Sequence, residues 1–113
     1  MLRSEIWLIT LDPTVGAEIR KSRPAVIVND DDIGILPLKI IVPVTDWDNR
    51  FDRFVWMTKL TPNRENGLSK ISGADAFQVR SVSQERFVRK LGIVSLERME
   101  EITDALALVL KFS

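Results

Sequence analysis

The sequence contains no cysteine and no histidine. Without cysteine there is no disulfide framework, no thiol nucleophile and no thiolate zinc site. Without histidine the commonest metal ligand and the commonest acid-base group are missing as well. We therefore expect neither a metal site nor a cofactor, and any chemistry falls to Arg, Lys, Asp, Glu, Ser, Thr and Gln.

An excess of either charge is also lacking, because 16 Lys and Arg residues balance 16 Asp and Glu residues. A net charge of zero argues against indiscriminate binding of nucleic acid by bulk charge. Any binding of this kind must use a local patch of basic residues.

Long apolar runs are absent too. The first apolar run, Ile6–Ile9, is short and follows the acid Glu5, which is unlike a signal peptide, and no segment is long enough to span a bilayer. We expect a cytoplasmic protein with no membrane partner. The chain has 113 residues, of which 45% are hydrophobic, and this is enough to form one hydrophobic core. We therefore expect a single domain over residues 1–113.

Short runs of β-branched and apolar residues, separated by turn-forming residues, predict a mainly β protein. The expected strands are Glu5–Leu11, Pro24–Val28, Lys39–Thr45, Phe54–Leu60, Gly73–Val82 and Phe87–Val94. Ser95 is the expected N-cap of a terminal helix, whose apolar stripe comprises Met99, Ile102, Leu106 and Val109. Short strands followed by one helix imply a small open or closed barrel with the helix docked on it, and Leu108 and Leu110 remain for an oligomer interface.

Two of these strands carry polar residues where they end. Arg23 precedes Pro24, which favours an extended backbone at Arg23, and Thr45 follows the run that contains Pro43. If the two strands are antiparallel neighbours, the guanidinium and the hydroxyl converge, and they form a candidate phosphate site. Taken alone, each residue is more often an ordinary solvated side chain.

Two loops have alternative interpretations. The acidic turn Asn29–Asp32 lacks the spacing of a calcium loop, which favours a solvated turn over a metal site. The segment Asp46–Arg53 places Trp47 and Phe51 beside arginines, a combination that suits stacking on unpaired bases. Aromatic side chains in such a loop more often pack against the hydrophobic core of the protein and anchor the loop there.

Several motifs together resemble the MazF/PemK (Kid) toxins of bacterial toxin-antitoxin pairs. The matching residues are Glu5-Ile6-Trp7, Leu11-Asp12-Pro13-Thr14-Val15-Gly16, Glu18, Arg23-Pro24, Pro43-Val44-Thr45 and Gln78-Val79-Arg80-Ser81. The resemblance covers nearly the whole chain in order and spacing. It implies an SH3-like barrel with a C-terminal helix, a homodimer, and sequence-specific, ribosome-independent cleavage of single-stranded mRNA. It also implies neutralisation by a cognate antitoxin protein.

The resemblance assigns roles to individual positions. Arg23 falls on the catalytic arginine and Thr45 on the catalytic threonine. The positions expected to bind RNA are Glu18, Arg20, Trp47, Gln78 and Arg80. The 2′-hydroxyl of RNA supplies the nucleophile, so a metal-independent endoribonuclease needs only to orient it, to assist its proton loss and to stabilise charge on the phosphorane. The expected products carry a 2′,3′-cyclic phosphate and a 5′-hydroxyl.

One position departs from the family pattern. Some relatives have an acidic residue directly before the Gln that corresponds to Gln78, whereas this chain has Phe77. Asp75, predicted on the same strand face two residues earlier, is a candidate replacement, and Glu18 is the candidate proton acceptor by motif. A non-enzymatic toxin resembling the CcdB gyrase poisons and a catalytically silent RNA-binding module of the same fold are the alternatives. The recognised RNA sequence cannot be read from these loops.

Overall fold

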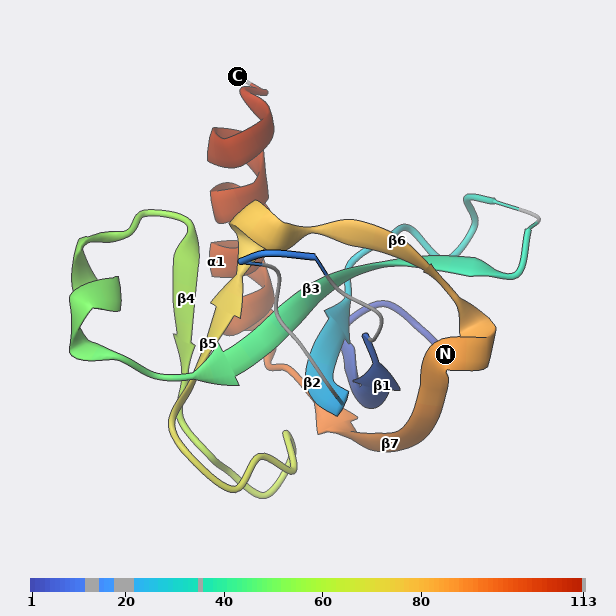
Figure 1. Cartoon of the computed structure of the whole chain (residues 1–113), viewed down its shortest axis with the longest axis horizontal. Helices are drawn as coiled ribbons and strands as arrows, with labels where there is room; N and C mark the ends of the chain where they lie inside the picture. The colour runs from blue at the N-terminus through green and yellow to red at the C-terminus, as the bar shows by residue number, and fades with distance from the viewer. Residues whose placement is uncertain (12–14, 18–21, 35, 113) are drawn as a thin grey trace.

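A computed structural model describes residues 1–11, 15–17, 22–34 and 36–112 of the chain. Figure 1 shows antiparallel strands with one helix at the C-terminus. The strands are β1 (Glu5–Thr10), β2 (Ser22–Ile27), β3 (Leu38–Asp46), β4 (Met57–Leu60), β5 (Ser72–Asp75), β6 (Arg80–Ser83) and β7 (Phe87–Ile93). Three short 3-10 helices, η1 (Asn49–Arg53), η2 (Ala76–Gln78) and η3 (Gln84–Arg86), lie between them, and α1 (Leu96–Leu110) follows.

The strands pair in the order β4-β5-β3-β2-β1-β7, and β6 pairs with β3 beside this path. No pairing within the described residues joins β4 to β7, so the sheet is open. The expected mainly β fold with one C-terminal helix is confirmed, and closure into a barrel stays a prediction. None of the helices that the structure describes is both long and apolar enough to cross a bilayer.

Two predicted strands differ from the observed ones. The strand predicted to start at Phe54 starts at Met57, because a turn after η1 precedes it. The strand predicted over Gly73–Val82 is broken by η2. Asp75 causes the break, because its carboxylate accepts a hydrogen bond from the backbone N–H of Phe77 at 3.0 Å and caps the 3-10 turn.

The core has two parts, on opposite faces of the central strands. Val26 and Val42 belong to the part beneath α1, while Ile27 and Ile41 belong to the other. This division follows from the alternation of side chains along a strand. The part beneath α1 contains Ile6, Val26, Val28, Val42, Val44, Leu60, Ala74, Val94, Met99 and Ile102. The other part contains Ile9, Leu11, Ala25, Ile27, Ile41 and Val82.

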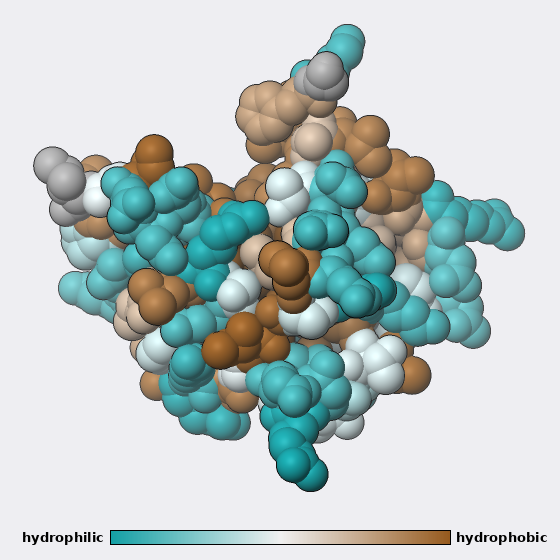
Figure 2. All heavy atoms as spheres, turned by 180° about the vertical axis from the view of Figure 1, so that it is seen from behind, coloured by the Kyte–Doolittle hydropathy of each residue, from teal (hydrophilic) through white to brown (hydrophobic). Residues whose placement is uncertain are grey.

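Helix α1 begins where the sequence predicts. The Ser95 side chain accepts a hydrogen bond from the N–H of Arg98 at 3.2 Å, which confirms the N-cap. Leu108, Leu110 and Phe112 remain exposed beyond the buried stripe. Figure 2 shows hydrophobic atoms gathered over this end of the helix.

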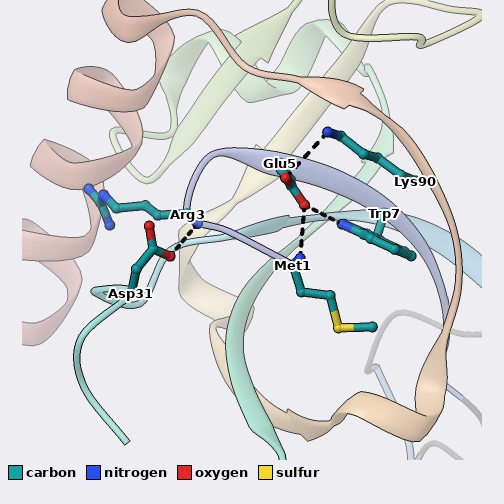
Figure 3. Close-up of polar contacts among 6 residues, drawn as sticks. All are labelled: Met1, Arg3, Glu5, Trp7, Asp31 and Lys90. Atoms are coloured by element: carbon teal, nitrogen blue, oxygen red, sulfur yellow. Dashed lines mark hydrogen bonds and ion pairs between the residues drawn. The ribbon is translucent and has the colours of Figure 1, made fainter.

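Glu5 is buried at 8% exposure and joins β1 to β7 (Figure 3). Its carboxylate accepts a hydrogen bond from Trp7 Nε1 at 2.9 Å and lies 3.3 Å from Lys90 Nζ and 3.5 Å from the amino nitrogen of Met1. Burial raises the pKa of Glu5, but the contacts from Trp7, the backbone of Leu2, Lys90 and the amino group outweigh it. Together they lower the pKa from 4.5 to about 2.

This network predicts an acid-dependent loss of stability. Because the folded-state pKa of Glu5 is depressed, its contribution is complete above pH 4.5 and disappears as the pH falls to about 2. We expect Glu5→Gln to lower the free energy of unfolding by about 1–2 kcal/mol at pH 7. In urea unfolding from pH 7 to pH 2, the difference from wild type should shrink on acidification. Glu85→Gln, at an exposed site, is the control, and a difference independent of pH would contradict the assignment.

Candidate anion-binding site

The predicted pairing of the strands that carry Arg23 and Thr45 is confirmed. Strands β2 and β3 are antiparallel, and Ala25 lies opposite Pro43. Two residues further along this register, Arg23 is level with Thr45. Here β3 has changed partners, because Thr45 lies opposite Gly73 of β5. Strand β2 therefore ends beside a strand that is turning away from it, and a cavity opens at this point.

Arg23 and Thr45 line this cavity of about 320 Å³. It lies where the start of β2, the end of β3 and β7 approach the loop that joins β4 to β5 (Figure 1). Three cations and one carboxylate surround it, so its local charge is positive although the chain is neutral. The lining residues are Leu8, Ser22, Arg23, Pro24, Val44, Thr45, Asp46, Gly67, Leu68, Ser69, Lys70, Ser72, Arg89 and Leu91.

The loop between β4 and β5 forms one wall of the cavity, and Asn66 holds its shape. Asn66 is 4% exposed. Its Oδ1 accepts hydrogen bonds from the N–H groups of Asn63 at 3.1 Å and Leu68 at 3.0 Å, and its Nδ2 donates to the carbonyl oxygen of Thr61 at 2.9 Å. Both the oxygen and the nitrogen of the buried amide are thus engaged within the loop, which stabilises one conformation.

Two glycines bring this wall directly against β7. Gly67 has φ +66°, and a Cβ there would overlap the carbonyl oxygen of Leu91. A Cβ at Gly92 would overlap the carbonyl oxygen of Glu65, which accepts a hydrogen bond from the N–H of Ile93 at 2.8 Å. The loop and the strand therefore touch backbone to backbone, and this contact sets the width of the cavity.

Sequence reasoning missed part of the cavity lining, in particular Lys70 and Arg89. Lys70 Nζ lies 3.2 Å from Asp46 Oδ2, and both side chains are exposed, at 67% and 59%. An exposed ion pair of this kind contributes little to stability, so Lys70 is easily released to another anion. The only signal for either cation was its basic character, which does not tell which way a side chain faces.

Two of the predicted RNA-binding residues, Gln78 and Arg80, do not line the cavity. Gln78 Nε2 donates to Asp75 Oδ2 at 3.2 Å. Burial raises the pKa of Asp75, and its hydrogen bonds from Gln78 and Phe77 offset this only in part. Phe77 lies in η2, so the expectation that Asp75 and Phe77 share a strand face is wrong. Their roles toward RNA stay predictions.

Trp47 is half-buried in the packing of its own loop. Its ring meets Phe51 edge-on at a centroid distance of 5.4 Å, and Lys59 Nζ lies 5.1 Å from the ring centroid. The indole nitrogen is buried without a hydrogen-bond partner among the described residues. Of the two interpretations of this loop, the structure shows the second, in which Trp47 packs within the protein. Glu18 and Arg20, also predicted to bind RNA, lie outside the described residues.

Together, the fold and the cavity define a small, mainly β protein with a cationic groove built from strand ends. Residues 2–110 match the model of the PemK-like, MazF-like toxin of type II toxin-antitoxin systems. The chain belongs to this family, as the sequence motifs predict.

Individual relatives agree with this assignment. Endoribonuclease MazF9 of Mycobacterium tuberculosis (strain ATCC 25618 / H37Rv) is 34% identical over 114 residues, which cover 96% of this chain and 94% of the relative. The crystal structure of MazF from Deinococcus radiodurans has the same fold, with a TM-score of 0.81, 20% identity and coverage of 99% of this chain and 97% of its own. An endoribonuclease in complex with its cognate antitoxin, from a mycobacterial species, has a TM-score of 0.75, 17% identity and coverage of 100% and 97%.

The contact between the loop and β7 can be tested with a matched pair of glycines. Gly34 also has a positive φ, +93°, but a Cβ there would meet nothing within 4 Å. Both Gly67→Ala and Gly34→Ala incur the backbone penalty of about 1–2 kcal/mol. We expect Gly67→Ala to lose about 1–3 kcal/mol more because of the overlap. Equal losses of unfolding free energy in thermal or urea unfolding would contradict the close contact.

Proposed function

We propose that this protein is the toxin of a type II toxin-antitoxin pair and a sequence-specific, ribosome-independent endoribonuclease that acts on single-stranded mRNA in the cytoplasm. The observation that carries the proposal is that Arg23 and Thr45, far apart in sequence, line one cationic cavity. The family match and the relative named endoribonuclease MazF9 support the same activity. Sequence specificity, independence from the ribosome and the site residues are parts of this proposal.

In the proposed reaction the 2′-hydroxyl oxygen of one ribose attacks the adjacent phosphorus. The bond from phosphorus to the 5′-oxygen breaks, the 2′-hydroxyl loses its proton to a base, and the leaving 5′-oxygen gains a proton. The Arg23 guanidinium binds non-bridging phosphate oxygens through paired N–H groups, and the Thr45 hydroxyl donates another hydrogen bond. Both groups are held on strands, so they are oriented before the charge develops.

A metal ion is not required by this scheme. RNA brings its own nucleophile, and the cations of the cavity stabilise the charge that builds on the phosphate. Glu18 stays the proton acceptor suggested by the motif. Asp75 is a less suitable base, because its carboxylate already accepts hydrogen bonds from Phe77 and Gln78.

A second candidate function is a catalytically silent RNA-binding module. The observation in its favour is Phe77, an exposed apolar residue where some relatives have an acid. The two functions differ in one assay. Purified protein incubated with a mixed RNA substrate cleaves it if the first proposal is right and only binds it if the second is right. A protein that neither binds nor cleaves RNA points to a non-enzymatic toxin of the CcdB kind.

Assembly is part of the proposal: a homodimer of SH3-like barrels, neutralised by a cognate antitoxin whose acidic residues meet Arg20, Lys21 and Arg23. Exposed Leu108, Leu110 and Phe112 form an apolar end of α1 (Figure 2) that symmetric pairing would cover. We expect light scattering to give a dimer at micromolar concentration. A monomer under these conditions would contradict the arrangement.

Substitution of Arg23 should separate activity from folding. Arg23 lies at the start of β2 and outside both parts of the core. We expect Arg23→Ala to lower the cleavage rate by at least about a thousandfold, because a charged transition-state contact is lost, while stability changes by only about 1 kcal/mol or less. Cleavage of a fluorescent RNA and thermal unfolding measure the two effects. Arg64→Ala, at an exposed site that is not among the residues lining the cavity, is the control. Full activity of Arg23→Ala would remove this residue from the mechanism.

The products distinguish the proposed reaction from hydrolysis assisted by metal ions. Attack by the 2′-hydroxyl must leave a 2′,3′-cyclic phosphate on one fragment and a 5′-hydroxyl on the other, equally well in excess EDTA. A 2′-deoxyribose at the cleavage position should stop the reaction while binding persists. Mass spectrometry of the fragments gives the end groups. Cleavage of the deoxy substrate, or a strict requirement for magnesium, would rule out this mechanism.

A further inference from the structure

We propose that Arg89 binds a second phosphate of the RNA, next to the one held by Arg23 and Thr45, and so positions the strand along the groove. The inference rests on the proposed function and adds a substrate-positioning residue to it. None of the motifs shared with the family includes Arg89.

The sheet places Arg89 and the start of β2 on either side of β1. Leu8 of β1 lies opposite Arg89 of β7 on one side and opposite Pro24 of β2 on the other. All three residues line the cavity. Since neighbouring strands are about 4.8 Å apart, the backbones of Arg89 and Pro24 are about 9.6 Å apart. The groove thus crosses β1 from Arg23 at one end to Arg89 at the other.

The floor between the two arginines is apolar. Leu8, Pro24 and Leu91 lie there, and Leu68 lines the wall formed by the loop. The groove therefore has a cation at each end and an apolar surface between them. A nucleic-acid strand matches this sequence of groups, because a nucleoside with apolar faces separates each phosphate from the next. A cavity of about 320 Å³ is at the lower end of the range for small-molecule sites and suits one such unit.

Arg89 has no task within the protein that the structure shows. The next residue, Lys90, faces Glu5 and forms an ion pair at 3.3 Å (Figure 3), as expected when successive side chains point to opposite faces of a strand. Within the described part of the chain, no hydrogen bond or ion pair engages the Arg89 guanidinium, whereas Lys70 across the cavity is held by Asp46. An exposed guanidinium that lines an anion cavity is available to a ligand without first breaking another contact.

The chemistry of the lining favours a phosphate over a protein carboxylate as the ligand. The guanidinium fork matches both groups. The hydroxyls of Ser22 and Ser69 line the same cavity, and they suit the many oxygen acceptors of a sugar-phosphate chain, while the Ser72 hydroxyl donates to the carbonyl oxygen of Lys70 at 2.8 Å. A carboxylate on an acidic antitoxin segment is the competing ligand, and the test below separates the two.

The first arm of the test measures RNA binding. A short single-stranded RNA that contains the mapped cleavage site, with 2′-deoxyribose at that position, is titrated with protein by fluorescence anisotropy at several salt concentrations. We expect Arg89→Ala to weaken binding about tenfold and to reduce the slope of log Kd against log salt by about 0.7. Arg89→Lys should recover most of the affinity. In cleavage assays KM should rise with kcat nearly unchanged. Arg64→Ala, exposed and outside the cavity, should match wild type.

The second arm locates the phosphate. Neutral methylphosphonates are placed one at a time within two nucleotides on either side of the cleavage site. If Arg89 binds a neighbouring phosphate, neutralising it weakens wild-type binding but has little further effect on Arg89→Ala, whereas all other positions affect both proteins equally. If instead the methylphosphonate at the scissile phosphate weakens binding by wild type but not by Arg89→Ala, the proposal is overturned. Arg89 would then bind the same phosphate as Arg23.

Other outcomes separate this inference from the proposed function. Equal Kd values for Arg89→Ala and Arg64→Ala, with wild type still cleaving RNA, would overturn the role of Arg89 alone. If Arg89→Ala binds RNA as well as wild type but no longer binds an acidic antitoxin peptide, the role of Arg89 toward RNA would also be overturned. The ligand of Arg89 would then be a carboxylate of the antitoxin. If wild-type protein leaves a mixed RNA substrate uncleaved but binds it, and Arg89→Ala weakens that binding relative to Arg64→Ala, the nuclease is overturned and the RNA-binding role of Arg89 is kept.

Discussion

Strand β3 pairs with β2 as far as Pro43 and with β5 from Val44 onward. Pro43 has no N–H to donate, so the ladder of hydrogen bonds is weakened where the exchange occurs. The strand is buried on both sides of this point, with Val42 and Val44 at 0% and 1% exposure. The core therefore fixes both how β3 turns and how far Thr45 lies from Arg23. The groove is a consequence of this one strand serving two sets of neighbours.

The groove also explains how a chain of zero net charge can attract a polyanion. Arg23, Lys70 and Arg89 come from three separate elements and meet around one cavity that contains a single carboxylate. Charges that average to zero over the sequence are separated in space. Under the proposed function, attraction to RNA would be local and sensitive to salt, because the three cations meet at this cavity.

The sequence predicted the elements that depend on local pattern. β-branched runs and a clear N-cap at Ser95 located β1, β2, β3, β7 and the helix. The break at Asp75 was missed because the residues after it continue an apolar alternation, while the side-chain cap that ends the strand has no such pattern. Arg23 and Thr45 were predicted from their places at strand ends and from the family motifs, but Arg89 was not. Its place in the groove depends on how β7 pairs with β1, which no local signal specifies.

The wall of the groove rests on Gly67 and Gly92, two residues without side chains, packed against the backbone of their neighbours. Between these two glycines in the sequence, Ser69 and Lys70 line the cavity with exposed side chains. Substitutions at these positions can change what the wall presents to a ligand without shifting the wall. Ser69 and Lys70 are therefore positions where the chemistry of the groove can change while its shape is kept, whereas a side chain at either glycine would force the loop away from β7.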